Sequence, residues 1–322
     1  MNPPDWLTFG SEWITTLQAS GPAWLTLVMD GFTWLGSEWF YLLVMPAVLW
    51  SYDSRLGIRL GVMLLLSGTV NSVLKLAFGL PRPFWIDSRI RALSPEGSFG
   101  LPSGHAQNGV ALWGLLAYDA RRPWAWVSAA LLILGISFSR VYLGVHFPAD
   151  VAGGWLVGAG LLLLVIGLGA RLSGWYSRVA LRTRVLAAGL LALALLAIGG
   201  LVWRAVEARP LPQEWQENYE AAAGASVFAP AAPDGILLAG GALFGFALGA
   251  VLLDSWDGFD GRRRGWTQGA RYLIGVIGLL VLYLGLRQVL PEGEVFRYLR
   301  YAAVGFWISY GAPRAFGALR IA

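Results

Sequence analysis

The sequence predicts an all-α protein with several membrane-spanning helices, and three observations support that prediction. Of the 322 residues, 57% are hydrophobic, and only 13% are charged. A water-facing domain of this length could not hide so much apolar surface. In addition, mainly apolar segments of roughly 20 residues, the length that crosses a bilayer as a helix, recur along the chain.

Nine such segments are expected to form helices in a membrane. The first is short, and Asp30 precedes it, so residues 1–36 are interpreted as an interfacial segment or as an early part of the first span. In chain order, the nine segments centre on residues 39–50, 56–80, 105–118, 124–141, 148–170, 185–202, 236–253, 272–290 and 296–310.

The charges of the loops predict the orientation in the membrane. If the spans alternate in direction, one side receives more than half of the 24 Lys and Arg residues, and the positive-inside rule makes that side cytoplasmic. The expected location is a bacterial inner membrane, with the other face on the periplasmic or extracellular side. The cytoplasmic set is Arg55, Arg59, Arg121, Arg122, Arg171, Arg178, Arg182, Arg184, Arg262, Arg263, Arg264, Arg271, Arg314 and Arg320.

Composition also excludes several classes of protein. There is no cysteine, so neither a disulfide nor a thiolate metal site can form. The arginines are scattered over short loops, so no nucleic-acid partner is expected. The N-terminal stretch lacks the parts of a secretory signal, and insertion is expected to rely on the first membrane helix. The long outer loop at 204–235 is expected to be an irregular cover, such as a lid over a site on the outer face, or a plain connector.

Ionisable residues within membrane spans are costly and usually functional, and here they fall at three places on the outer side. The first place holds Arg82 and Lys75, the only lysine of the chain. Seven residues make nearly two helical turns, so both cations would share one face if the helix continues to Pro81. A snorkelling lysine and an ordinary interfacial arginine would explain the same pattern.

The second place is the start of a predicted helix, at Pro102-Ser103-Gly104-His105. Ser103 is a candidate cap, and the free backbone N–H groups of a helix start can bind an anion. His105 lies in the first turn, where it could contact that anion and move a proton near neutral pH. A surface histidine beside a cap is the alternative interpretation.

The third place joins the end of one predicted span to the start of the next. Arg140 ends the earlier span, and His146 and Asp150 stand four residues apart around Pro148, which suits a first helical turn. A carboxylate that holds one imidazole nitrogen leaves the other nitrogen free as a nucleophile. A capping aspartate beside a bystander histidine would give the same spacing.

Together, the three places indicate chemistry on phosphate. The chain has two histidines and one lysine, and all three lie in these segments. Three cations, two histidines and one carboxylate on the same face of a membrane provide what phosphoryl transfer needs. These needs are positive charge for the phosphate oxygens, a nucleophile, and an acid for the leaving group.

The order and spacing of these residues resemble the three-part signature of the type 2 phosphatidic acid phosphatase superfamily. Here the signature reads Lys75, six residues and Arg82-Pro83; then Pro102 to His105; then Ser139-Arg140, five residues, His146, three residues and Asp150. The resemblance covers residues 37–170. It implies a metal-independent membrane phosphatase with a six-helix core, followed by about three additional C-terminal transmembrane helices.

The resemblance also implies a role for each residue. Catalysis would fall to His146 as the nucleophile that becomes phosphohistidine, Asp150 as the group that orients it, and His105 as acid and then base. The phosphate would be bound by Lys75, Arg82, Ser103, Gly104 and Arg140. No metal and no other cofactor is expected. The chain would divide into residues 1–36, the catalytic core 37–170, a sixth core helix at 171–203, the outer loop 204–235 and the three-helix extension 236–322.

The sequence leaves the substrate open. The segments "KLAFGLPRPFW" and "SRVYLGVHFPADV" are similar to those of glucose-6-phosphatase, a family member with nine spans, although that enzyme lacks the carboxylate at the position of Asp150. The expected substrate is a lipid phosphate or pyrophosphate monoester, with the lipid and the bilayer as partners. Hydrolysis of a soluble phosphate ester, phosphate transfer to a lipid, and an inactive transporter or scaffold are the alternatives. The number of subunits is not predicted.

Overall fold

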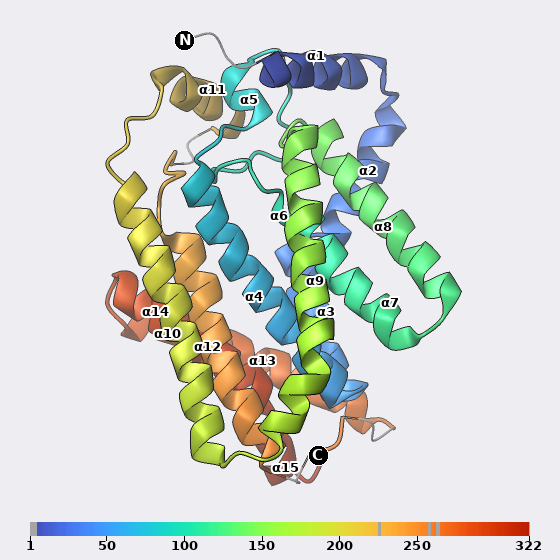
Figure 1. Cartoon of the computed structure of the whole chain (residues 1–322), viewed down its shortest axis with the longest axis vertical. Coiled ribbons are helices and arrows are strands. Elements are labelled where there is room, and N and C mark those ends of the chain that lie inside the picture. The colour runs from blue at the N-terminus through green and yellow to red at the C-terminus, as the bar shows by residue number, and fades with distance from the viewer. Residues whose placement is uncertain (1–4, 225–226, 257–258, 262–264, 322) are drawn as a thin grey trace. The chain divides into compact units, whose positions relative to one another are not determined.

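The computed structural model describes residues 5–224, 227–256, 259–261 and 265–321, and every regular element within them is helical (Figure 1). The all-α prediction is therefore confirmed for these residues. Arg262, Arg263 and Arg264 of the predicted cytoplasmic set lie outside the described residues. The elements are α1 (Asp5–Ser20), α2 (Ala23–Leu35), α3 (Glu38–Ser51), α4 (Ser54–Phe78), α5 (Pro83–Ile86), α6 (Gly104–Asn108), η1 (Gly109–Trp113), α7 (Gly114–Ala120), α8 (Pro123–Tyr142), α9 (Pro148–Tyr176), α10 (Leu181–Val206), α11 (Gln213–Ala223), α12 (Asp234–Asp254), α13 (Thr267–Val289), α14 (Glu294–Phe306), η2 (Trp307–Gly311) and α15 (Ala312–Ala318).

Among the described residues, six helices are long and apolar enough to cross a membrane, or seven if the bent pair α2 and α3 is one span. The sequence predicted nine spans. Helices also cover the predicted segments 105–118 and 296–310, but a π-helical stretch, η1 or η2, divides each of them. Neither segment therefore contains one long α-helix. The six are Ser54–Ile86, Pro123–Tyr142, Pro148–Gly169, Leu181–Val206, Asp234–Asp254 and Thr267–Val289.

The chain forms two compact units. Unit 1 contains the residues up to 40 together with 70–163 and 201–232, and unit 2 contains 41–69, 164–200 and the residues from 233 onward. Helices α3, α4, α9 and α10 contribute residues to both units. All the candidate site residues belong to unit 1.

In unit 1, α1 crosses the C-terminal end of α8 (Figure 1), and Gln18 fastens it there. The buried Gln18 amide donates to the carbonyl oxygens of Arg91 and Tyr142, at 2.9 Å each, and its oxygen accepts from the Arg91 N–H at 3.0 Å. Tyr142 ends the helix that carries Arg140, and Arg91 lies in the loop before α6. Helix α1 therefore ties together two segments that carry candidate residues.

The first motif does not have the helical geometry that the sequence predicted. Helix α4 ends at Phe78, where the Gly79 N–H donates to the Lys75 carbonyl at 2.9 Å and Gly79 has a φ of +60°. Arg82 follows in an extended conformation directly before α5, so Lys75 and Arg82 do not share a helix face. The expected continuation to Pro81 is wrong because Gly79 readily adopts the left-handed conformation that closes a helix.

The segment 204–235 contains a helix where an irregular chain was expected. Helix α11 packs against α5, and Asn218 Nδ2 donates to the Trp85 carbonyl at 2.9 Å. The ring centroids of Trp215 and Tyr219 lie 5.9 and 6.4 Å from that of Trp85. These two residues stand one turn apart in a largely polar helix, so the apolar stripe was too short to predict from hydropathy.

In unit 2, α12 and α14 pack backbone against backbone. Gly241 and Gly245 stand one turn apart on α12, and a Cβ atom on Gly245 would overlap the carbonyl oxygen of Ala302 on α14. Small residues at this spacing allow membrane helices to approach closely.

The buried Arg271 on α13 joins three other segments of unit 2. Its guanidinium donates to the carbonyl oxygens of Ile321, Asp260 and Trp50, at 2.6, 3.1 and 3.2 Å. Three chain segments thus meet around one arginine, which provides donors for their carbonyl groups.

Gly245→Ala should lower the thermal stability of the protein in detergent. The added methyl group would meet the backbone of α14, and overpacking of this kind costs about 1–3 kcal/mol. Gly285→Ala on α13 is the matched control, because nothing lies within 4 Å of a Cβ atom at that position. Thermal unfolding followed by tryptophan fluorescence should give a lower midpoint for Gly245→Ala alone. Equal midpoints for the two variants would contradict the close packing of α12 and α14.

Candidate active site

The candidate residues lie at helix ends and in short connections of unit 1. Five of them belong to one network of hydrogen bonds that includes side chains of the loop before α6, namely Lys75, Arg82, Arg140, His146 and Asp150. Among the described residues, no side-chain hydrogen bond joins Ser103 or His105 to this network. In chain order, Lys75 lies in the last turn of α4, Arg82 before α5, Ser103 before α6, Gly104 and His105 at the start of α6, Arg140 in the last turn of α8, His146 before α9 and Asp150 in the first turn of α9.

His146 and Asp150 form a buried pair. The Nδ1 atom of His146 lies 3.2 Å from Asp150 Oδ2, and the same oxygen accepts from the Phe147 N–H at 3.0 Å. On the other side of the ring, Nε2 lies 3.2 Å from Arg82 Nη1. A guanidinium can only donate, so Nε2 is the acceptor and the ring proton belongs on Nδ1, toward Asp150.

The surroundings keep His146 uncharged. Burial lowers the pKa of His146, and the positive charges of Arg82 and Arg140 lower it further, well below its usual range. At neutral pH the lone pair of Nε2 is therefore not taken up by a proton, and this nitrogen is able to act as a nucleophile.

Arg82 is fully buried, and acceptors surround its guanidinium. Nε donates to the Ser98 carbonyl at 2.6 Å, and Nη1 donates to the Val145 carbonyl at 2.9 Å as well as to His146. Nη2 donates to Glu96 at 2.7 Å and to the Ser98 hydroxyl at 3.0 Å. The arginine therefore connects the loop before α6 with the turn before α9.

The same loop reaches the other two cations. The Ser98 hydroxyl accepts from Lys75 Nζ at 2.9 Å, and Glu96 accepts from Arg140 Nη2. Arg140 Nη1 donates to the Thr33 hydroxyl on α2 at 2.5 Å. Two side chains of one loop, Glu96 and Ser98, thus bring three cations together.

The segment Pro102 to His105 provides a second wall of the site. The Ser103 N–H donates to the Asp150 carbonyl at 2.9 Å, and Asn71 donates to the Pro102 carbonyl at 3.1 Å. Ser103 stands at the N-cap position, but its hydroxyl makes no cap bond. Within the described part of the chain, this buried hydroxyl and the Nε atom of Arg140 have no partner. Buried donors without partners are unusual in a folded protein and are what a bound anion would satisfy.

Sequence reasoning missed Glu96, Ser98, Thr33 and Asn71. The only signal for Glu96 and Ser98 is their place between two motifs, as polar residues of a loop on the motif side. Thr33 lies in the segment 1–36 that was interpreted as interfacial, Asn71 lies in the predicted span 56–80, and neither has a distinguishing pattern. Among the described residues, no group of three or more His, Asp or Glu side chains could hold a metal ion.

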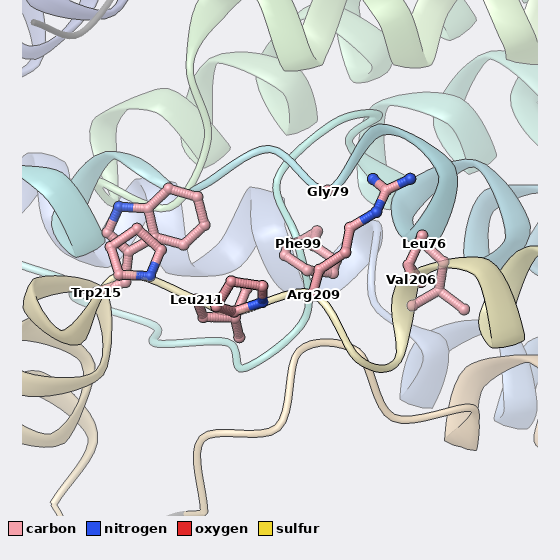
Figure 2. A pocket seen from close by; sticks show the side chains of 9 residues that line it. Leu76, Gly79, Phe99, Val206, Arg209, Leu211 and Trp215 are labelled. Atoms are coloured by element: carbon pink, nitrogen blue, oxygen red, sulfur yellow. The ribbon is translucent and has the colours of Figure 1, made fainter. Parts of the chain in front are cut away.

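Unit 1 also contains a cavity of about 120 Å³ that is lined mostly by apolar residues (Figure 2). Its wall includes Leu76 and Phe99, the neighbours of Lys75 and Ser98 in the chain. The side chain of Arg209 extends toward Gly79, as Figure 2 shows. The lining residues are Leu76, Gly79, Phe99, Val206, Arg209, Pro210, Leu211, Pro212 and Trp215.

Two family descriptions match the sequence. One is the PAP2 superfamily, over residues 56–174, and the other is the PAP2 superfamily phosphatase transmembrane extension, over residues 237–322. The first range contains every candidate residue, and the second begins within α12.

Several named proteins match the chain over part of their length. Phosphatidylglycerophosphatase B of Bacillus subtilis is 34% identical over 163 residues, covering 45% of this chain and 75% of that protein. Undecaprenyl-diphosphatase of Sulfolobus acidocaldarius is 29% identical, covering 41% of this chain and 64% of that protein. Glucose-6-phosphatase 3 of Mus musculus is 30% identical, covering 51% of this chain and 51% of that protein. The crystal structure of a transmembrane PAP2 type phosphatidylglycerolphosphate phosphatase from Bacillus subtilis is 27% identical, with a TM-score of 0.45 over 52% of this chain and 88% of that chain.

Arg82→Gln should raise the pKa of His146. The substitution removes the positive charge that has the largest effect on this pKa. The imidazole should therefore take up its proton at a higher pH than in the unchanged protein. NMR of protein labelled with 15N at histidine would follow the ring through a pH titration, and only two histidines need to be assigned. Arg89→Gln, at an exposed position outside the network, is the control. Identical titrations for the three proteins would rule out Arg82 as a cause.

Proposed function

This chain belongs to the PAP2 superfamily, and from that membership we propose that it is an integral-membrane phosphatase of phosphorylated lipids that works through a phosphohistidine on His146. Its site would face the periplasmic or extracellular side of a bacterial inner membrane. The observation that supports the mechanism is the line of Arg82, His146 and Asp150, in which Nε2 is the ring nitrogen without a proton.

In the first step, His146 Nε2 would attack the phosphorus atom of the ester. A nitrogen–phosphorus bond forms as the bond from phosphorus to the leaving oxygen breaks, and Asp150 stabilises the positive charge that develops on the ring. His105 would donate a proton to the leaving oxygen, which departs as an alcohol.

In the second step, His105 would act as a base. It takes a proton from a water molecule while the water oxygen attacks phosphorus, and the bond from phosphorus to Nε2 breaks. Inorganic phosphate leaves, His146 returns to its neutral form and His105 has recovered its proton. The sum of the two steps is hydrolysis of a phosphate ester.

The phosphate oxygens would be bound by the cations and donors around His146. The unpaired Ser103 hydroxyl and Arg140 Nε support this assignment, because both are buried donors. Lys75 and Arg82 would add positive charge, and Gly104 its backbone N–H. Three cationic side chains can balance the charge of one phosphate group, so we propose that the reaction needs no metal ion.

A lipid substrate is favoured by the cavity whose wall includes Leu76, the residue after Lys75 in the chain. Its walls are mostly apolar side chains, so it would suit a hydrocarbon chain better than a sugar. The names of the bacterial and archaeal relatives agree with a lipid, whereas the match to a glucose-6-phosphatase keeps a soluble phosphate ester as the second candidate. Transfer of the phosphate to a lipid acceptor would use the same first step.

His146→Ala should abolish both turnover and the labelled phosphoenzyme. His105→Ala should slow hydrolysis by about 10²–10⁴-fold, the usual contribution of a general acid and base. Rapid quenching with a 32P-labelled substrate, followed by a test for acid-labile label, measures the intermediate. Phosphate release by the unchanged protein should continue in EDTA. An active His146→Ala variant would disprove the proposed nucleophile, and loss of activity in EDTA would disprove metal independence.

Leu211→Asn should raise the KM for long-chain phosphatidic acid. It puts a polar side chain in the apolar cavity, and losing contact with one or two methylene groups, at about 0.8 kcal/mol each, weakens binding roughly tenfold. The KM for a short-chain analogue or for p-nitrophenyl phosphate should not change. Leu319→Asn, at an exposed position outside the six candidate spans, is the control. An equal effect on long-chain and short-chain substrates would favour a soluble phosphate ester.

A further inference from the structure

One carboxylate outside the three motifs connects two of the proposed phosphate-binding arginines. Glu96 Oε2 accepts from Arg82 Nη2 at 2.7 Å, and Glu96 Oε1 accepts from Arg140 Nη2. The arginine side chains are 0% and 1% exposed, whereas that of Glu96 is 30% exposed. Glu96 therefore extends from an accessible position to two cations that are out of reach of solvent.

The two arginines depend on Glu96 to different degrees. Arg82 is also held by the backbone carbonyls of Ser98 and Val145, so its guanidinium keeps its place without the carboxylate. Arg140 has one other side-chain partner among the described residues, the Thr33 hydroxyl. Loss of the carboxylate would therefore leave Arg82 fixed and allow Arg140 to turn.

The charge of Glu96 matters as well as its shape. Burial by itself would raise the pKa of Glu96, but the positive charges of Arg82, Arg140 and Lys75 outweigh burial and hold this pKa well below its usual range. Glu96 is therefore ionised near neutral pH. Its negative charge offsets the repulsion between two buried guanidinium groups, which a neutral amide of the same shape could not do.

We propose that Glu96 is a positioning residue of this site, which holds Arg140 beside Arg82 in the arrangement that receives the phosphate group and does not itself contact the phosphate. This inference rests on the proposed phosphatase function and adds to it a residue that acts through another. The two carboxylate oxygens accept hydrogen bonds from different arginines. The residue at position 96 must therefore carry a negative charge and provide two acceptor oxygens.

A double-mutant cycle of Glu96→Gln and Arg140→Gln tests this inference. The kcat and KM for phosphatidic acid and the number of sites that form labelled phosphoenzyme are measured for the unchanged protein, the two single variants and the double variant. If Glu96 acts through Arg140, removing Glu96 has little further effect once Arg140 is gone. Glu12→Gln, an exposed glutamate of α1, is the matched control and should have normal turnover.

We expect Glu96→Gln alone to lower kcat by about 10–100-fold, with KM changed by less than about threefold and the number of phosphorylated sites unchanged. In the Arg140→Gln background, the same substitution should change kcat by less than about threefold.

A loss of kcat in the double variant equal to the product of the losses in the two single variants would show that Glu96 acts independently of Arg140. Normal or faster turnover of Glu96→Gln would show that Glu96 competes with phosphate, and fewer sites with a normal rate per site would reduce its role to folding. Each of these results overturns the inference. An unchanged protein without phosphatase activity instead overturns the proposed function, and the inference falls with it.

Discussion

Burial of the Arg82 guanidinium is the constraint on which the rest of the site depends. A charge taken out of water is tolerated only where hydrogen-bond acceptors already surround it. The acceptors of Arg82 come from the loop before α6 and from the turn before α9, which are far apart in the chain. Both segments must be in place before this arginine can be buried. The motif residues and the loop between them therefore form one cooperative structure.

The sequence predicted which residues gather at the site better than it predicted how they are connected. Lysine and histidine are rare in this chain, and their position at the ends of apolar segments pointed to function because charge is costly there. Glu96 and Thr33 could not be found in the same way. Their contacts with Arg140 bring together residues that are distant in the chain, and such contacts leave no local pattern.

The fold was predictable in class and less so in detail. Hydropathy alone led to an all-α membrane protein, because long apolar segments have few other solutions in a bilayer. The π-helical stretches η1 and η2 were also not predicted, because hydropathy does not register a change of hydrogen-bonding pattern within a continuous helical segment. The conformation of Arg82 was predicted wrongly because one glycine, Gly79, ends α4 early. Helix α11 was missed because only two aromatic residues, the buried Tyr219 and the partly buried Trp215, form the apolar stripe that packs against Trp85.

The anchoring of α1 by Gln18 has a consequence for how this protein can vary. The side-chain amide of Gln18 contacts only main-chain atoms, namely the carbonyl oxygens of Arg91 and Tyr142 and the N–H of Arg91. Every amino acid except proline offers the same atoms, so the bonds of this amide do not depend on the side chains at positions 91 and 142. The Arg91 guanidinium adds one further bond of its own, to the Gln18 carbonyl oxygen at 3.3 Å. The side chain at position 18 is more restricted, because few side chains are as long as glutamine and carry both a hydrogen-bond donor and an acceptor at their end. The attachment of α1 therefore constrains the side chain at position 18 more strongly than the side chains at the positions that it reaches.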